Sequence, residues 1–219
     1  MIRSVFKLYV DRWEFFLDLL LQHIGITIIA VSIITMLGFI IGILMTKNET
    51  FAVIMLTITN FLYTIPSIAL FGFLVTITGI GNKSAVIALI LYGLLPIIRN
   101  TYVGIKEVDP QVIESAVGMG TTEWQLLFRI KLPLALPVII TGFRTMVIMT
   151  ISLGGIASFI GAGGLGVAIY RGISTYFPEM IIAGSLLVAL LAIITDWFLQ
   201  LEEKKLRIRV FGPETKDKK

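Results

Sequence analysis

Glu114-Ser115-Ala116-Val117-Gly118-Met119-Gly120 opens a polar segment in an apolar chain, and Ile130-Lys131-Leu132-Pro133 closes it. The segment sets a carboxylate, two small residues, a glycine and a closing proline at fixed separations. Small side chains allow a second backbone to approach closely. Gly120 accepts a positive φ that other residues resist. The pattern favours a short docking helix followed by a turn, and the alternative is a plain amphipathic loop.

The composition places the chain in a lipid bilayer. Hydrophobic residues make up 57% of the 219 residues and charged residues 15%, and the mean hydropathy is +0.95. Soluble domains have about 45–50% apolar and about 25% charged residues. The chain has no cysteine and only one histidine, His23, which excludes thiol chemistry and a histidine metal cluster. The mixed charges of the first residues do not resemble a cleaved signal peptide.

Five membrane spans are predicted, since each span needs roughly 20 apolar residues. They cover about 24–46, 51–78, 85–98, 138–159 and 180–201. Gly38 and Gly42 give the first span a face of small residues that suits close helix packing. Pro66 is expected to kink the second span, because proline has no N–H for a helix hydrogen bond.

Three segments lie outside these spans. Residues 1–19 are predicted to form an amphipathic segment, either lying in the membrane interface or simply leading into the first span. The membrane domain proper is expected at 20–201. Its polar region, about 99–136, is expected to hold two short helices that begin at Asp109-Pro110 and at Thr121-Thr122-Glu123. Residues 202–219 are expected to form a charged tail.

The charge distribution predicts an orientation. With the polar region on the cytoplasmic side, twelve Lys and Arg residues lie inside: seven in the tail, four in the polar region and Lys47 in the turn after the first span. Five remain outside: Arg3, Lys7, Arg12, Lys83 and Arg171. This bias follows the positive-inside rule. It predicts a cytoplasmic C-terminus and an N-terminus on the opposite side.

The segment from Glu114 to Pro133 resembles the EAA loop (E-A-A-x3-G-x9-I-x-L-P) of ABC importer membrane subunits, with Ser115 in place of the second-position alanine. In that family the loop is cytoplasmic and forms a coupling helix that docks on the ATPase. The resemblance therefore implies a set of ATPase-coupling residues: Glu114, Ser115, Ala116, Gly120, Ile130, Leu132 and Pro133.

Further segments are similar to permeases of osmoprotectant importers, which carry glycine betaine, carnitine or choline. They include Thr64–Leu70, Leu95–Thr101, Gly142–Thr145 and Phe159–Gly166. The resemblance implies an all-α, five-span, type I ABC importer permease fold like that of methionine importers. It also implies an ATPase subunit that binds ATP and magnesium, an extracytoplasmic binding protein, a second permease and membrane lipid. Nucleic acid is not expected as a partner, and methionine permeases remain the alternative family.

Candidate pathway or helix-shaping residues come from the same segments and from charges within spans. They are Tyr63, Thr64, Pro66, Ser67, Pro96, Arg144, Gly161, Gly163 and Gly164. Tyr63 stands where the family often has glutamine, which leaves the substrate open. Arg144 and Asp196 are ionisable groups inside spans. Such groups indicate function by default, and snorkelling or an internal ion pair is the alternative.

Two other function classes are weaker. A passive channel would need no ATPase, and the EAA pattern argues against it. An intramembrane enzyme would need a cluster of reactive groups, and the spans hold only isolated ones. The glycine-rich Gly161–Gly166 lacks the following Lys-Ser/Thr of a phosphate-binding loop, so no ATP site, metal site or catalytic residue is predicted in this chain.

Overall fold

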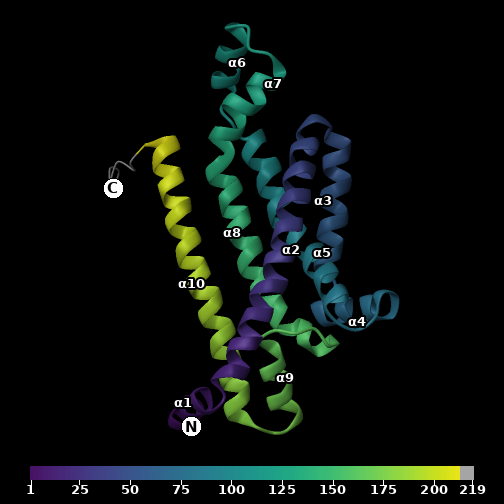
Figure 1. Cartoon of the computed structure of the whole chain (residues 1–219). Coiled ribbons are helices and arrows are strands. Elements are labelled where there is room, and N and C mark those ends of the chain that lie inside the picture. The colour runs from purple at the N-terminus through teal and green to yellow at the C-terminus, as the bar shows by residue number, and fades with distance from the viewer. Residues whose placement is uncertain (213–219) are drawn as a thin grey trace.

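The computed structural model describes residues 1–212, and all the regular secondary structure in that range is helical. The long helices of the bundle lie along one common axis (Figure 1). They are α2 (Trp13–Lys47), α3 (Glu49–Thr64), α5 (Asn82–Lys106), α8 (Leu132–Ala157) and α10 (Pro178–Phe211). The N-terminus lies at one end of the bundle and α10 finishes near the other.

The second predicted span is broken rather than kinked. α3 ends at Thr64 and α4 (Ser67–Thr78) begins at an angle of 100° to it. Pro66 disfavours helical geometry at the residue before it, and Ile65 is accordingly extended, with ψ of 128°. Four single helices in residues 1–212 are long and apolar enough to span a membrane, and α3 with α4 makes a fifth if the pair is one span.

The bundle is built around α5, which packs against α2, α8, α3 and α4. Its contact with α2 depends on the small-residue face predicted from Gly38 and Gly42, both of which are buried. A Cβ added at Gly42 would lie 2.6 Å from Thr101 Cβ and 3.2 Å from the Ile98 carbonyl oxygen. Glycine at this position therefore sets how closely the two backbones approach.

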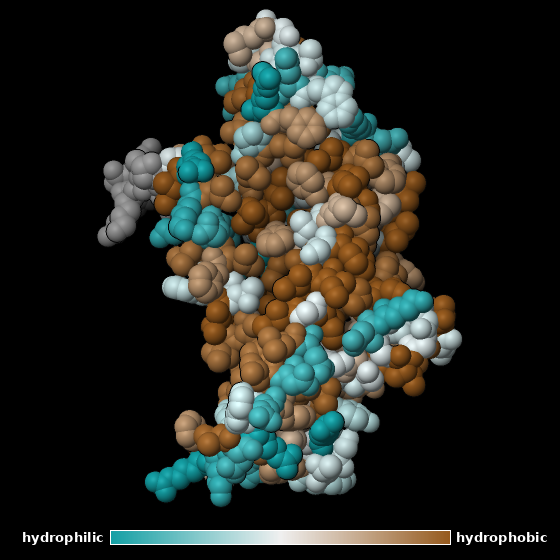
Figure 2. All heavy atoms as spheres, viewed as in Figure 1, coloured by the Kyte–Doolittle hydropathy of each residue, from teal (hydrophilic) through white to brown (hydrophobic). Residues whose placement is uncertain are grey.

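On the face that Figure 2 shows, apolar residues form a band across the middle of the molecule, and polar residues gather toward its two ends. The band fits a bilayer with both ends in water. The short helices α6 (Pro110–Gly118) and α7 (Glu123–Gln125) project from one end. α1 (Ile2–Asp11) and α9 (Gly166–Ser174) lie at the other.

The segments outside the spans differ in extent from the sequence prediction. α1 stops at Arg12, where the backbone leaves helical geometry, and α2 starts directly after it. Val5 and Leu8 of α1 are buried, and the Tyr9 hydroxyl donates to the Ala183 carbonyl of α10 at 2.7 Å. The charged segment after residue 201 continues α10 as helix to Phe211. The rest of the predicted tail, 213–219, lies outside the described residues.

Candidate functional site

The segment that resembles the coupling loop forms a helix and a turn at one end of the bundle. Asp109 caps the start of α6: its side chain accepts from the Gln111 N–H at 2.8 Å, and Pro110 is the first residue of the helix. Glu114 and Ser115 are exposed on α6. The helix start predicted at Asp109-Pro110 is confirmed.

The turn after α6 requires glycine at position 120. Gly120 has φ of 82°, and its N–H donates to the Val117 carbonyl at 2.9 Å. Thr121 N–H then reaches back to the Ala116 carbonyl at 3.2 Å. A side chain at this φ would be strained. The chain can therefore reverse direction here and start α7, which Thr122 caps with its side chain.

The coupling candidates divide into an exposed set, a packed set and two partly buried residues, Ile130 and Pro133. Ala116 and Leu132 are buried, and α6 packs against η1 (Leu126–Lys131), which runs into α8. Glu114, Ser115 and Gly120 are exposed. Three apolar side chains beside them are exposed too: Val112, Val117 and Met119. Exposed apolar side chains on a helix that projects beyond the apolar band are typical of a docking surface.

An aromatic contact, which no local sequence pattern predicts, connects this region to the α2–α3 turn. Trp124 and Phe128 stack with ring centroids 5.5 Å apart. Lys47 Nζ, at the end of α2, lies 4.9 Å from the Trp124 ring centroid. Phe128 belongs to a π-helical stretch, η1 (Leu126–Lys131), that runs directly into α8. π-Helical stretches often mark functional positions.

The break between α3 and α4 is attached to α5 and α8 by two tyrosines. The Tyr92 hydroxyl of α5 donates to the carbonyl of Ile65, a residue that lies between α3 and α4 and belongs to neither helix. The Tyr63 ring lies 6.0 Å from the Tyr92 ring, and its hydroxyl is 3.6 Å from Met149 Sδ of α8. Tyr63 is 48% exposed, whereas Tyr92 is buried. The Tyr63 ring is therefore accessible from outside the bundle, whereas the Tyr92 ring is not.

α8 carries a polar face that neighbouring helices leave exposed. It consists of Thr141, Thr145 and Ser152. At about 100° per residue, Arg144 lies to one side of this face and Met149 to the other. Arg144 reaches across to α10, and Met149 contacts Tyr63 of α3. The polar face of α8 is thus bounded by α10 on one side and by the α3–α4 break on the other.

Arg144 and Asp196 form an ion pair, which the sequence left open. Arg144 Nε donates to Asp196 Oδ1 at 2.6 Å and Nη2 donates to Oδ2 at 2.8 Å. Arg144 Nη1 also donates to Glu203 Oε2 at 3.1 Å. Thr141 donates to the other oxygen of Glu203 at 2.6 Å. These four hydrogen bonds join α8 to α10. They stabilise the charges of Arg144 and Asp196, which would otherwise be unfavourable within apolar helices.

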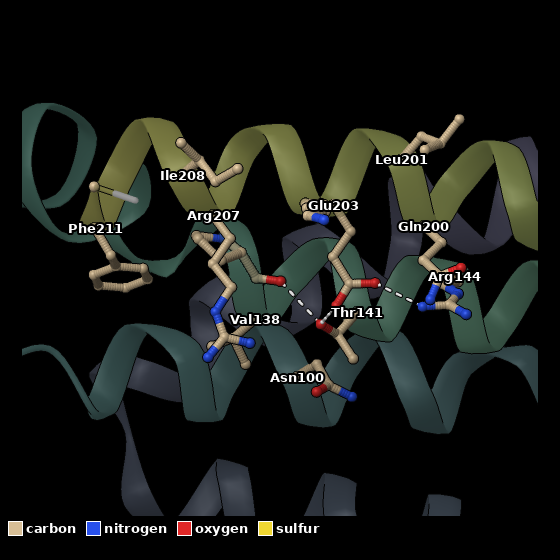
Figure 3. A pocket seen from close by; sticks show the side chains of 13 residues that line it. Asn100, Val138, Thr141, Arg144, Gln200, Leu201, Glu203, Arg207, Ile208 and Phe211 are labelled. Carbon is tan, nitrogen blue, oxygen red and sulfur yellow. Dashed lines mark hydrogen bonds and ion pairs between the residues drawn. The ribbon is translucent and has the colours of Figure 1, made fainter. Parts of the chain in front are cut away.

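A cleft of about 1200 Å³ opens beside this network between α8 and α10 (Figure 3). We call it the α8–α10 cleft. Figure 1 shows α10 leaning away from α8 toward the end that carries α6. The cleft walls combine Thr141 and Arg144 of α8 with Glu203, Lys204 and Arg207 of α10.

The predicted glycine-rich turn lies at the end of the bundle opposite α6. Gly163 N–H donates to Asn82 Oδ1 at 3.1 Å, and Gly164 N–H donates to Gln22 Oε1 at 3.2 Å. The His23 ring is buried beside Gly164 and lies 3.0 Å from the Ile151 carbonyl oxygen. The turn is thus held by α2 and α5. Of the remaining candidates, Pro96 sits inside α5 without ending that helix. Thr64 and Ser67 flank the α3–α4 break, and Gly161 has φ of 77°.

Comparison with known proteins decides the family. The sequence profile of binding-protein-dependent transport system inner membrane components matches residues 34–208. The chain belongs to this family. The prediction of a membrane-spanning permease subunit is therefore confirmed.

Two curated relatives and one solved structure illustrate the similarity. The permease is 40% identical over 184 residues to the glycine betaine/carnitine/choline transport system permease protein OpuCB of Bacillus subtilis (strain 168), covering 84% of this chain and 85% of that one. It is 43% identical over 166 residues, or 76% of its length, to the ergothioneine transport permease/ergothioneine binding protein EgtU of Helicobacter pylori (strain G27). It spans only 30% of that longer protein.

The solved structure fixes the fold class. An inward-facing structure of the MetNI methionine ABC transporter superposes with a TM-score of 0.78, covering 87% of the permease and 95% of that chain at 21% identity. At this identity the match concerns the fold alone. The predicted all-α, methionine-importer-like type I permease fold is confirmed.

Proposed function

We propose that this permease is the membrane subunit of an ATP-driven importer for solutes that carry a quaternary ammonium group. The observation that carries the proposal is the exposed polar face of α8, bounded by Tyr63 and by the Arg144–Asp196 pair. The Thr145 and Ser152 hydroxyls donate to carbonyls of their own helix and Thr141 donates to Glu203, so the exposed side of each oxygen can still accept from water or from another protein chain. We assign this face to the translocation pathway.

The substrate class is supported by the relatives. One is named for glycine betaine, carnitine and choline and the other for ergothioneine. All four compounds carry a trimethylammonium group, and all but choline carry a carboxylate as well. Similarity of about 40% to permeases for these solutes favours an osmoprotectant over methionine. The methionine transporter resembles this chain at 21% identity, which concerns fold only.

In this proposal ATP hydrolysis by a separate ATPase subunit, which binds ATP and magnesium, supplies the energy. It docks on α6 and the Gly120 turn, where Val117 is 54% exposed and Met119 is 80% exposed. α7, η1 and α8 belong to one continuous helical run from Glu123 to Ile160. A movement of the docked α6 is therefore transmitted to α8 through α7 and η1. Tilting of α8 would then switch access to the pathway.

A second permease, identical or a sibling, completes the pathway in this proposal by facing the polar face of α8. An extracytoplasmic binding protein delivers the solute at the end that carries α9. The orientation follows from the charge bias, with α6 and the C-terminus in the cytoplasm and α1 outside.

The test is the ATPase activity of the whole complex in liposomes. The permease is co-expressed with its ATPase and binding protein and titrated with glycine betaine, carnitine, choline and methionine. Stimulation by the quaternary amines supports the proposal. Stimulation by methionine alone would transfer the permease to the rival substrate class. Failure to co-purify with any ATPase would refute the importer assignment.

A further inference from the structure

α1 has an exposed apolar stripe beside the face that it buries against the bundle. Val5 and Leu8 are buried. At about 100° per residue, Ile2, Phe6 and Val10 form the adjacent stripe, and all three side chains are exposed, Phe6 to 70%. Because water is an unfavourable neighbour for so much apolar surface, this stripe is stabilised by contact with hydrocarbon.

A basic stripe lies directly beside the apolar one. Arg3 and Lys7 are one helical turn apart, at about 100° and about 140° around the helix from Ile2. Both are exposed, and within residues 1–212 neither forms an ion pair. Asp11 and Ser4 follow on the next part of the surface and are exposed as well. An apolar stripe bordered by unpaired cations and then by polar groups is typical of a helix that lies among lipid head groups.

An apolar groove separates α1 from the first turns of α10, beside which it lies (Figure 1). The groove has a volume of about 230 Å³ and is lined by Ile2, Val5 and Phe6 of α1 and by Ile182 and Leu186 of α10. An apolar cavity of about 150 Å³ accepts a molecule as large as benzene. The groove therefore has room for several methylene groups of an acyl chain.

The groove continues into an exposed apolar stripe of α10. Leu186, Leu190 and Ile193 are all exposed and lie on one face of the helix, at i, i+4 and i+7. From Ile182 to Ile193 the stripe extends about 16 Å along the helix axis, toward the middle of the bundle. The hydrocarbon part of one leaflet is about 15 Å thick. An acyl chain that enters at the groove can therefore follow α10 to the bilayer midplane.

We infer that the α1–α10 groove binds one phospholipid with an anionic head group, in the leaflet at the end of the bundle opposite α6. Its phosphate contacts Arg3 and Lys7, and one of its acyl chains fills the groove. Phosphatidylglycerol suits the site better than phosphatidylethanolamine, because the ammonium of phosphatidylethanolamine would approach two cations. The inference goes beyond the proposed function and does not depend on which solute the permease carries.

Native mass spectrometry of the complete transporter tests the site. The purified complex is titrated in detergent with phosphatidylglycerol or with phosphatidylethanolamine, and the lipid molecules bound per permease are counted at each concentration. We expect the wild type to bind phosphatidylglycerol at lower concentrations than phosphatidylethanolamine. Arg3→Gln and Lys7→Gln should each weaken phosphatidylglycerol binding about fivefold, and they should affect phosphatidylethanolamine less.

Exposed residues elsewhere supply matched controls. Lys83→Gln removes a cation at the same end of the bundle but outside the groove, and it should leave the binding of both lipids unchanged. Leu186→Trp fills the groove and should weaken the binding of both lipids. Leu190→Trp, one turn further along the same stripe of α10, should not. All these side chains are exposed, so the substitutions should not prevent folding.

Three results would overturn the inference. The first is equal binding of the two lipids by the wild type, and the second is an equal effect of Leu186→Trp and Leu190→Trp. The third concerns a protein partner. Because the sequence has no cysteine, Val10→Cys adds a single thiol to the exposed stripe of α1. A disulfide between the Val10→Cys thiols of two permeases in one complex would place a second permease on this stripe instead of lipid.

Discussion

Arg144 of α8 and Asp196 of α10 share two hydrogen bonds, at 2.6 Å and 2.8 Å, although 52 residues separate them in the chain. This is the geometry in which a guanidinium matches both oxygens of one carboxylate. The pair fixes the rotation of α10 relative to α8 and forms one boundary of the polar face of α8. It also brings Glu203 to the edge of the α8–α10 cleft.

Removal of Arg144 should be more harmful than removal of its partner's charge. Arg144→Met removes the guanidinium that both Asp196 and Glu203 contact, whereas Asp196→Asn keeps the Arg144–Glu203 pair. Because the pair is partly solvated, we expect a loss of about 1–3 kcal/mol for Arg144→Met, between surface and buried values. Thermal denaturation of the purified complex measures both variants. Equal melting temperatures would contradict the assigned network.

The turn at Gly120 should be required for coupling. Gly120→Val places a β-branched residue at φ of 82°, which costs on the order of 1–3 kcal/mol locally. We expect the variant to reach the membrane but to lose glycine betaine uptake, because α6 no longer presents its docking surface. Gly118→Ala is the control, since it has ordinary φ and open space around its Cβ. Normal uptake by Gly120→Val would argue against the docking role.

Replacement by alanine should destabilise the protein at one glycine of α2, Gly42, and be tolerated at another, Gly25. Gly42→Ala places a Cβ 2.6 Å from Thr101 Cβ and should destabilise the α2–α5 contact by about 1–3 kcal/mol. Gly25→Ala meets no atom within 4 Å and should be tolerated. The melting temperatures of the two variants in one detergent make the comparison. A loss that is equal at both positions would mean that helix packing does not depend on Gly42.

The α3–α4 break should depend on Tyr92 more than on Tyr63. Tyr92→Phe removes the hydroxyl that donates to the Ile65 carbonyl and leaves that carbonyl without its partner, at a cost of about 1–3 kcal/mol. Tyr63→Phe removes only a weak contact with the Met149 sulfur. We expect Tyr92→Phe to melt at a lower temperature and Tyr63→Phe to resemble the wild type. The reverse order would show that the break is held in another way.

Local signals predicted much of this fold. Apolar runs indicated five crossings, Asp109 and Pro110 marked the start of α6, and Gly120 marked its turn. These features are readable because each depends on residues close together in the chain. The small-residue face of Gly38 and Gly42 was also visible from spacing alone.

Features that depend on contacts between helices were less accessible. Pro66 predicted a disrupted helix at this position. The 100° bend between α3 and α4 also involves the hydrogen bond from the Tyr92 hydroxyl of α5 to the Ile65 carbonyl, which is not visible from the local sequence. The pairing of Arg144 with Asp196 depends on how two helices are rotated against each other, which no local pattern specifies. The extension of α10 to Phe211 was missed because charged residues ended the apolar run before they ended the helix.

The most direct measurement is accumulation of labelled glycine betaine in proteoliposomes that contain the permease, its ATPase and its binding protein. The account predicts uptake above the external concentration with ATP on the ATPase side, and none with ADP. Uptake that proceeds equally well without ATP would make the chain a passive pore and contradict the account.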